Sequence, residues 1–236
     1  MTEAVDIEAE LQAADPDRWL STRMIADPQA RAEVIALYAL NHALARIAPS
    51  VSEPMMGHIR LAWWREALEE LAAGKPARAH PVVEALDGPI ERGAFDPVAL
   101  DALVEARAPE FEPEALKDEA SLYAHIDATA GALAALAAKR LHPDSPRGAV
   151  TEAMRAWGVA GLARSGRVPA AWLDAGLAAR VEAHLKAARA ELKALPVKAF
   201  PAVAYAAFAR DYARGREPGL FGKQMRLLGA TVSGKV

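Results

Sequence analysis

The chain has 236 residues, of which 57 are alanine, and 53% of its residues are hydrophobic. It contains no cysteine, which excludes disulfide bonds, cysteine-ligated metal sites and a thiol nucleophile. The net charge of −3 arises from 28 basic and 31 acidic residues spread along the chain, so there is no basic surface typical of nucleic-acid binding.

From the sequence we expect neither an export signal nor a membrane span. Acidic residues, among them Glu3 and Glu10, come before the first basic residue, Arg18, which is the reverse of a secretory or transit peptide. The nearly uncharged stretch 124–138 is rich in alanine and contains His125 and Asp127, so it falls short of a span. We therefore expect a cytoplasmic protein, and leave open a peripheral membrane contact through one amphipathic face.

Two helices are predicted near the N-terminal end of the chain. In residues 28–48 apolar side chains recur at steps of three and four, with Asp27 as the N-cap and Pro28 at the first helical position. Pro49 and Ser50 end this helix. A second one covers residues 55–73, with Ser52 predicted as the capping residue of the turn that leads into it.

The rest of the chain also reads as helices separated by Pro and Gly. Breaks are expected at Gly88-Pro89 and Arg92-Gly93. The predicted helices cover residues 81–91, 96–106, 114–141, 147–162, 173–195, 200–216 and 221–228. Because no strand pattern, fixed repeat or Gly/Ser linker is present, we predict a single all-α domain over residues 1–236, a helical bundle.

Several short motifs occur in an order that is specific to one family. They read DRWL at 17–20, ALYALN at 36–41, VSEP at 51–54 and IRLAWWREAL at 59–68, with weaker agreement at residues 80–83, 123, 129–131, 157–158 and 166–169. In this order they resemble the squalene/phytoene synthase family over roughly residues 15–175. The resemblance implies the isoprenoid synthase fold, a helical bundle around a central cavity in which two prenyl diphosphates are joined head to head.

Active members of that family carry two aspartate-rich motifs that hold Mg²⁺, and neither is found in this sequence. The place of the first reads HALARIAP at 42–49, with Arg46 and no acid. The second is missing from residues 145–173, where the only acid is Glu152. Because Mg²⁺ is held mainly by carboxylate oxygens and water, we expect no cofactor and no metal ligand. Mg²⁺ would be needed only if the chain is a transferase.

The remaining candidates for a site are arginines, aromatic residues and polar residues near the motif positions. A guanidinium group can grip an anion with two hydrogen bonds, although solvent-exposed arginines are commoner. Trp63 and Trp64 point about 100° apart on a helix, so one can enter the core while the other meets a ligand. We predict no catalytic residue. The candidates for a cavity or anion site are Tyr38, Asn41, Arg46, Ser52, Glu53, Arg60, Trp63, Trp64, Arg65 and Arg164.

Three functions stay open. The leading hypothesis is a non-catalytic accessory protein, since the pattern is similar to the branch of the family that contains an assembly factor of respiratory complex I. Its partners would then be subunits of that complex, at the inner face of the membrane. The alternatives are a transferase that condenses prenyl diphosphates head to head, and a carrier that binds an isoprenoid or lipid without metal.

Overall fold

The structure is a computed structural model that describes residues 6–112, 114–164 and 176–236. Every regular element in these ranges is helical and none is a strand, which confirms the predicted all-α class. The α-helices are α1 (Ile7–Ala14), α2 (Pro16–Thr22), α3 (Pro28–Ala45), α4 (Pro54–Ala72), α5 (Pro81–Glu91), α6 (Pro97–Glu105), α7 (Glu119–Ile126), α8 (Ala132–Leu141), α9 (Thr151–Arg164), α11 (Leu177–Glu191), α12 (Ala209–Tyr212) and α13 (Leu220–Ser233).

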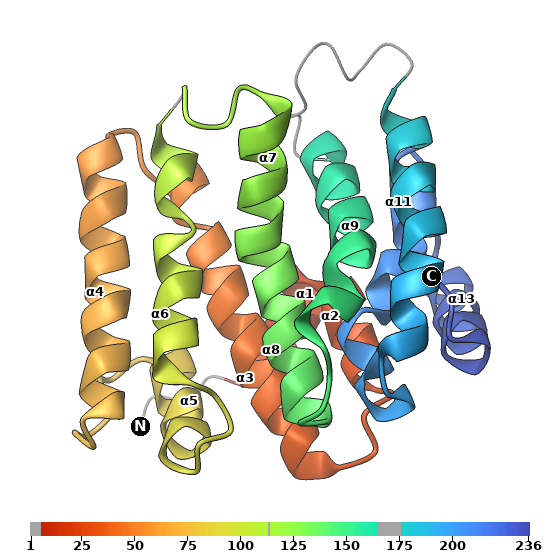
Figure 1. The fold of residues 1–236 in the computed structure, drawn as a ribbon. Helices are drawn as coiled ribbons and strands as arrows, with labels where there is room; N and C mark the ends of the chain where they lie inside the picture. Colours follow the sequence, from red (N-terminus) through yellow and green to blue (C-terminus); the bar gives the residue numbers. More distant parts are fainter. Residues whose placement is uncertain (1–5, 113, 165–175) are drawn as a thin grey trace.

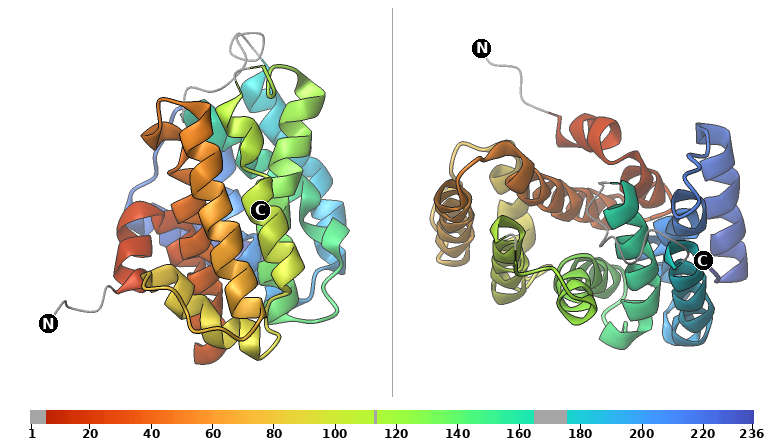
Figure 2. Two further views of the ribbon diagram at one scale, coloured as in Figure 1. Left: turned by 90° about the vertical axis from the view of Figure 1, so that its left-hand side faces the viewer. Right: turned by 90° about the horizontal axis from the view of Figure 1, so that it is seen from above.

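The helices form a bundle around one hydrophobic core. Figure 1 shows α4, α6, α7, α9 and α11 standing roughly upright beside one another. The view from above in Figure 2 shows α1–α3 on one side of the bundle and α6–α8 on the other. One cluster of buried apolar side chains extends from Leu11 in α1 to Ala230 in α13, so the described residues share a single core. No described helix is both long enough and apolar enough to cross a membrane.

Three helix starts follow one local rule, an Asp followed by a Pro. Asp15, Asp27 and Asp96 each precede a Pro in the first helical turn, and each side chain accepts a hydrogen bond from a backbone N–H two or three residues further on. This confirms the predicted cap at Asp27. The predicted cap at Ser52 is wrong. Because Pro54 takes the first position of α4, the capping position falls on Glu53, whose side chain makes no capping hydrogen bond.

The N-terminal half contains helices that the periodicity did not predict. α1 and α2 have only 8 and 7 residues, too few to show a clear repeat. The predicted break at Gly88-Pro89 is also wrong, since Pro89 lies inside α5 with its ring buried. That helix ends at Glu91 and is followed by Gly93, whose φ of +68° is a conformation that glycine adopts without strain.

The C-terminal half is less regular than predicted. The expected helix 114–141 begins only at Glu119 and contains a π-helical segment at Asp127–Gly131. Much of the expected helix 200–216 consists of 3₁₀ turns, at Val197–Ala202 and Ala204–Phe208. The motif at 166–169 and the predicted helix start at Leu173 lie outside the described residues.

Small residues bring the central helices close together. Ala137 of α8 and Ala156 and Ala160 of α9 are fully buried. A Cβ atom added to Gly158 of α9 would lie 2.5 Å from Cγ2 of Ile126 in α7, so this contact requires glycine. The many alanines therefore draw the helices inward.

Candidate functional site

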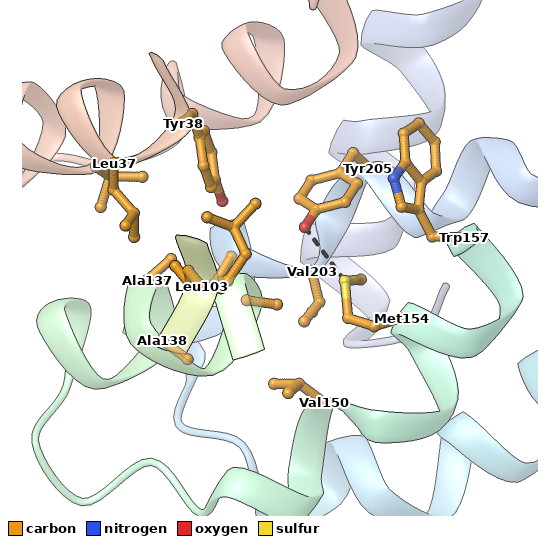
Figure 3. Packing of buried hydrophobic residues seen from close by; sticks show 14 of the residues in the cluster. Leu37, Tyr38, Leu103, Ala137, Ala138, Val150, Met154, Trp157, Val203 and Tyr205 are labelled. Carbon is orange, nitrogen blue, oxygen red and sulfur yellow. Dashed lines mark hydrogen bonds between the residues drawn. The ribbon is translucent and has the colours of Figure 1, made fainter. Parts of the chain in front are cut away.

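Three aromatic rings meet in the interior of the bundle. Tyr38 of α3 meets Tyr205 edge to face, with ring centroids 6.2 Å apart, and Trp157 of α9 meets the same Tyr205 ring at 5.0 Å. The Tyr205 hydroxyl donates a hydrogen bond to the sulfur of Met154 at 3.2 Å. Figure 3 shows these side chains converging from α3, α9 and the 3₁₀ segment Ala204–Phe208. The predicted site residue Tyr38 is thus a fully buried core residue.

The charged group beside these rings is a cation. The guanidinium of Arg18 lies 4.9 Å from the ring centroid of Tyr205 and 5.6 Å from that of Trp157. Asp15 accepts a hydrogen bond from this guanidinium at 2.6 Å. Burial alone would lower the pKa of Arg18, but the interaction with Asp15 outweighs it and raises that pKa. Arg18 therefore stays charged at the edge of the core.

Asn41, another predicted site residue, belongs to a second buried polar cluster. Its side-chain oxygen accepts a hydrogen bond from Arg107 at 2.6 Å. Arg107 also pairs with Glu110 at 2.7 Å, and His125 lies 3.2 Å from the same carboxylate. Burial would raise the pKa of Glu110, yet the contacts with His125 and Arg107 hold it below its usual range. Periodicity could not have predicted this cluster, because its members come from three segments.

Four of the predicted residues come together in one surface pocket of about 500 Å³, which we call the Arg46 pocket. It lies between the end of α3, α4 and the start of α5. Arg60 donates a hydrogen bond to the Ser50 hydroxyl at 2.6 Å. Neither Arg46 nor Arg60 has a carboxylate partner among the described residues. The lining residues are Ala43, Arg46, Ile47, Ser50, Arg60, Trp63, Trp64 and His80.

The aromatic wall of the Arg46 pocket includes a residue that was not predicted, His80. Its ring lies 4.8 Å from Trp64 and 5.6 Å from Trp63, and the two tryptophan rings meet edge to face at 5.2 Å. Its Nδ1 accepts the backbone N–H of Val82, which caps α5. Burial lowers the pKa of His80, which favours the neutral ring. The sequence feature that could have identified His80 is its position directly before Pro81, the first residue of α5.

The other predicted residues of α4 lie outside that pocket. Arg65 forms ion pairs with Asp101 at 2.7 Å and Glu105 at 3.0 Å, and so ties α4 to α6. Ser52 and Glu53 are exposed in the turn before α4. These three residues therefore do not share a site with Arg46.

Arg164 lies at the end of α9 in a cluster around Asp17. Its guanidinium covers the ring of Tyr212 at 4.3 Å and lies 3.6 Å from the Asp17 carboxylate. The Tyr212 hydroxyl donates a hydrogen bond to Asp17 at 2.5 Å, and the Lys223 ammonium lies 2.7 Å from the same carboxylate. Burial and the hydrogen bond to Asp17 both raise the pKa of Tyr212. This cluster fastens α2 to α12 and α13.

A second pocket, a groove of about 1050 Å³, lies between α5, α6 and α8. Its wall includes exposed Val98 and half-buried Leu136. Four cations, Arg92, Lys139, Arg140 and Arg147, also line it. Within the described ranges, no three His, Asp or Glu side chains gather in a way that could hold a metal ion.

Comparisons with known proteins agree with this fold. The family model "Squalene/phytoene synthase" matches residues 11–165. A solved structure titled "Crystal structure of a dehydrosqualene synthase in complex with ligand" is similar to this chain with a TM-score of 0.73. At 13% identity, the alignment covers 96% of this chain and 94% of that one, so this likeness shows the isoprenoid synthase fold alone. No curated protein matches. The chain belongs to the squalene/phytoene synthase family.

Proposed function

We propose that this protein is a non-catalytic member of its family that helps to assemble another protein complex. The single observation that carries this proposal is the packed interior of the bundle. Tyr38, Trp157 and Tyr205 pack against one another in the buried core, whereas the family resemblance implies a central substrate cavity, and the charged groups beside these rings are Arg18 and its partner Asp15. A diphosphate held by Mg²⁺ needs carboxylates that are free to bind the metal, whereas the Asp15 carboxylate is paired with Arg18.

The residues at the two motif positions also do not fit Mg²⁺. Residues 42–49 contain no acid, and Arg46 faces the surface pocket. The end of α9 from Trp157 to Arg164 contains no acid either. A metal site requires hard oxygen ligands, and these segments offer none. We therefore propose that the protein uses no metal cofactor.

Our proposal for which complex is assembled rests on the similarity of the sequence to one branch of the family. The sequence pattern is similar to the family branch that contains an assembly factor of respiratory complex I, so we propose subunits of NADH:quinone oxidoreductase as partners. We accordingly propose that the protein works in the cytoplasm, at the inner face of the respiratory membrane. Fold likeness alone does not determine function, which makes a direct test necessary.

Turnover and assembly can be tested separately. Purified protein incubated with farnesyl or geranylgeranyl diphosphate, Mg²⁺ and NADPH should release no pyrophosphate, measured against a family synthase as positive control. Deleting the gene in its native host should lower the amount of assembled NADH:quinone oxidoreductase on native gels, and the wild-type gene should restore it. Release at enzymatic rates would establish the transferase alternative, and an unchanged amount of complex would refute the assembly role.

A second candidate function, a metal-free isoprenoid or lipid carrier, is supported by the groove of about 1050 Å³. Lys139 and Arg147 line this groove, whereas Arg92 and Arg140 are paired there with Glu33. Calorimetry with farnesyl diphosphate and no metal tests it. Lys139→Ala with Arg147→Ala should weaken binding if the groove is the site, and Arg46→Ala with Arg60→Ala should do so if the Arg46 pocket is. Arg65→Ala is the matched control on α4, because Arg65 lies outside both. If calorimetry detects no binding of farnesyl diphosphate, the carrier hypothesis is refuted.

A further inference from the structure

The Arg46 pocket is lined by two guanidinium groups and by no carboxylate. Arg46 lies at the C-cap of α3, and its guanidinium has no partner among the described residues. Arg60 of α4 has no carboxylate partner in the same ranges. Most of the other described arginines, such as Arg65 and Arg78, pair with carboxylates. The two guanidinium groups of this pocket therefore have charge and hydrogen-bond donors to offer to a ligand.

Arg60 is held in place by a chain of hydrogen bonds. Its Nη1 donates to the Ser50 hydroxyl at 2.6 Å, and that hydroxyl donates to the backbone carbonyl of Ile47 at 2.8 Å. The donors on Nε and Nη2 of Arg60 have no partner among the described residues. Because the guanidinium is already positioned, binding an anion with these unused donors costs less side-chain entropy.

The aromatic wall of the pocket adds further donors. Because Nδ1 of His80 accepts the backbone N–H of Val82, the neutral ring carries its proton on Nε2. Trp64 is only 6% exposed, and its indole N–H has no hydrogen-bond partner within the described ranges. The ring of Trp63 is covered by the guanidinium of Arg78, which lies 5.4 Å from its centroid. The three rings therefore have N–H donors to offer and no free acceptor.

Two acids act on His80 without lining the pocket. Burial lowers the pKa of His80, and the charges of Glu10 and Glu84 offset part of that shift. Neither of these carboxylates lines the pocket, and neither pairs with Arg46 or Arg60. The donors of the pocket therefore remain available to an anion from solution.

The charge and the lining of the pocket favour an organic phosphate. Two guanidinium groups match a phosphate monoester, which has three free oxygens and a charge of about −1.5 to −2, better than a carboxylate with one charge. The rest of the lining is mostly apolar or aromatic, and aromatic rings pack well edge to face or offset. A volume of about 500 Å³ is typical of a small-molecule site. The apolar and aromatic lining residues are Ala43, Ile47, Trp63, Trp64 and His80.

We propose that the Arg46 pocket binds a small phosphate monoester that carries an aromatic ring, as a nucleoside monophosphate does. Arg46 and Arg60 hold the phosphate, and Trp63 and Trp64 contact the ring. The inference does not depend on the assembly role or on the carrier function, since it uses only the lining of this pocket and the partners of its side chains.

Calorimetry with the full chain and three probes tests the proposal. Adenosine monophosphate (AMP) should bind more tightly than inorganic phosphate, which lacks the ring, and more tightly than adenosine, which lacks the phosphate. The double variant Arg46→Ala with Arg60→Ala should weaken AMP binding at least about tenfold, because hydrogen bonds to a charged group are lost. Arg65→Ala is the matched control on α4 and should bind AMP as the wild type does, because Arg65 pairs with Asp101 outside the pocket.

A second readout uses the wild-type chain and so does not depend on the folding of the double variant. In nuclear magnetic resonance spectra, the indole N–H signals of Trp63 and Trp64 should move when AMP is added. These signals are assigned with Trp63→Phe and Trp64→Phe. The signal of Trp157, which is buried in the core, should stay in place.

Four results would overturn the proposal. AMP does not bind, or the double variant binds it as tightly as the wild type does, or the signals of Trp63 and Trp64 do not move. The fourth is that inorganic phosphate binds as tightly as AMP, since the ring then contributes nothing. Farnesyl diphosphate is the comparison ligand. If it binds more tightly than AMP through the same two arginines, the aromatic ligand is wrong and the carrier function is supported instead.

Discussion

The carboxylate of Glu33 joins three helices, and replacing it should cost more stability than any exposed ion pair. Glu33 lies on α3 with its side chain 3% exposed. It accepts hydrogen bonds from Arg92 at the end of α5, at 2.8 Å, and from Arg140 of α8. Gln29, one turn earlier on α3, donates a third at 3.2 Å. Glu33→Gln keeps the shape of the side chain and removes its charge.

The magnitude follows from the burial of the two arginines. Breaking a buried ion pair by removing one partner costs about 3–5 kcal/mol. Arg140 is 20% exposed and Arg92 is 50% exposed, so water can solvate part of the uncompensated charge. We therefore expect a loss of about 3 kcal/mol. That loss would lower the melting temperature of a chain of this size by about 6–12 °C.

The assay is urea unfolding at pH 7 followed by circular dichroism, with Glu105→Gln as control. Glu105 is 61% exposed and pairs with Arg65 on the surface, so its removal should cost less than about 1 kcal/mol. If the Glu33 variant loses no more stability than the Glu105 variant, the reasoning from burial is wrong.

The stability difference should also depend on pH. Burial alone would raise the pKa of Glu33, but the hydrogen bonds from Arg92 and Arg140 outweigh it and hold that pKa below its usual 4.5. The ionised carboxylate therefore contributes its full stabilisation above about pH 4.5, and this is lost as the pH falls through the pKa of the folded state. The wild type and Glu33→Gln should converge in acid. A constant difference down to about pH 3 would contradict this account.

Two further substitutions test the packing and the attachment of α13. Gly158→Ala should destabilise the protein by about 1–3 kcal/mol because the new Cβ would lie 2.5 Å from Ile126. Gly161→Ala on the same helix meets nothing within 4 Å and should be neutral or stabilising by up to about 1 kcal/mol; equal losses in thermal unfolding would refute the close contact. Lys223→Met should cost about 3 kcal/mol because it leaves Asp17 buried without its ammonium, and should speed amide exchange in α13. Asp17→Asn added to Lys223→Met should recover part of that loss in urea unfolding, and no recovery would contradict the pairing.

Local features of the fold could be predicted from the sequence because they depend on neighbouring residues. Asp27 and Pro28 start a helix through contacts within one turn, and the periodicity of α3 indicates its buried side. Pro89 was misinterpreted because a proline in the last turn of a helix costs only one hydrogen bond. The 3₁₀ segments were also missed, since their geometry depends on packing against distant elements.

The candidate site was harder to predict because it depends on contacts between residues that are far apart in the sequence. Arg60, Trp63 and Trp64 share a pocket because they lie within about one turn of each other on α4. Arg65 follows directly in the sequence, yet its partner Asp101 is 36 residues away, which no local pattern reveals. The packed interior depends on Arg18 and Tyr205 coming together from opposite ends of the chain, and only the structure shows this contact.

The fastening of α2 by α12 and α13 has a consequence for the order of folding during synthesis. Asp17 and Tyr212 are 195 residues apart, and Met24 and Thr231 are 207 residues apart. The carboxylate of Asp17 leaves the ribosome early but meets its hydroxyl and ammonium partners only when nearly the whole chain has been made. Closing so long a loop adds little entropy cost beyond a shorter one, so the delay affects the rate of folding more than the final stability. A nascent chain that stalls before Tyr212 keeps α2 without its partners, and chaperones and proteases can distinguish it from the finished protein.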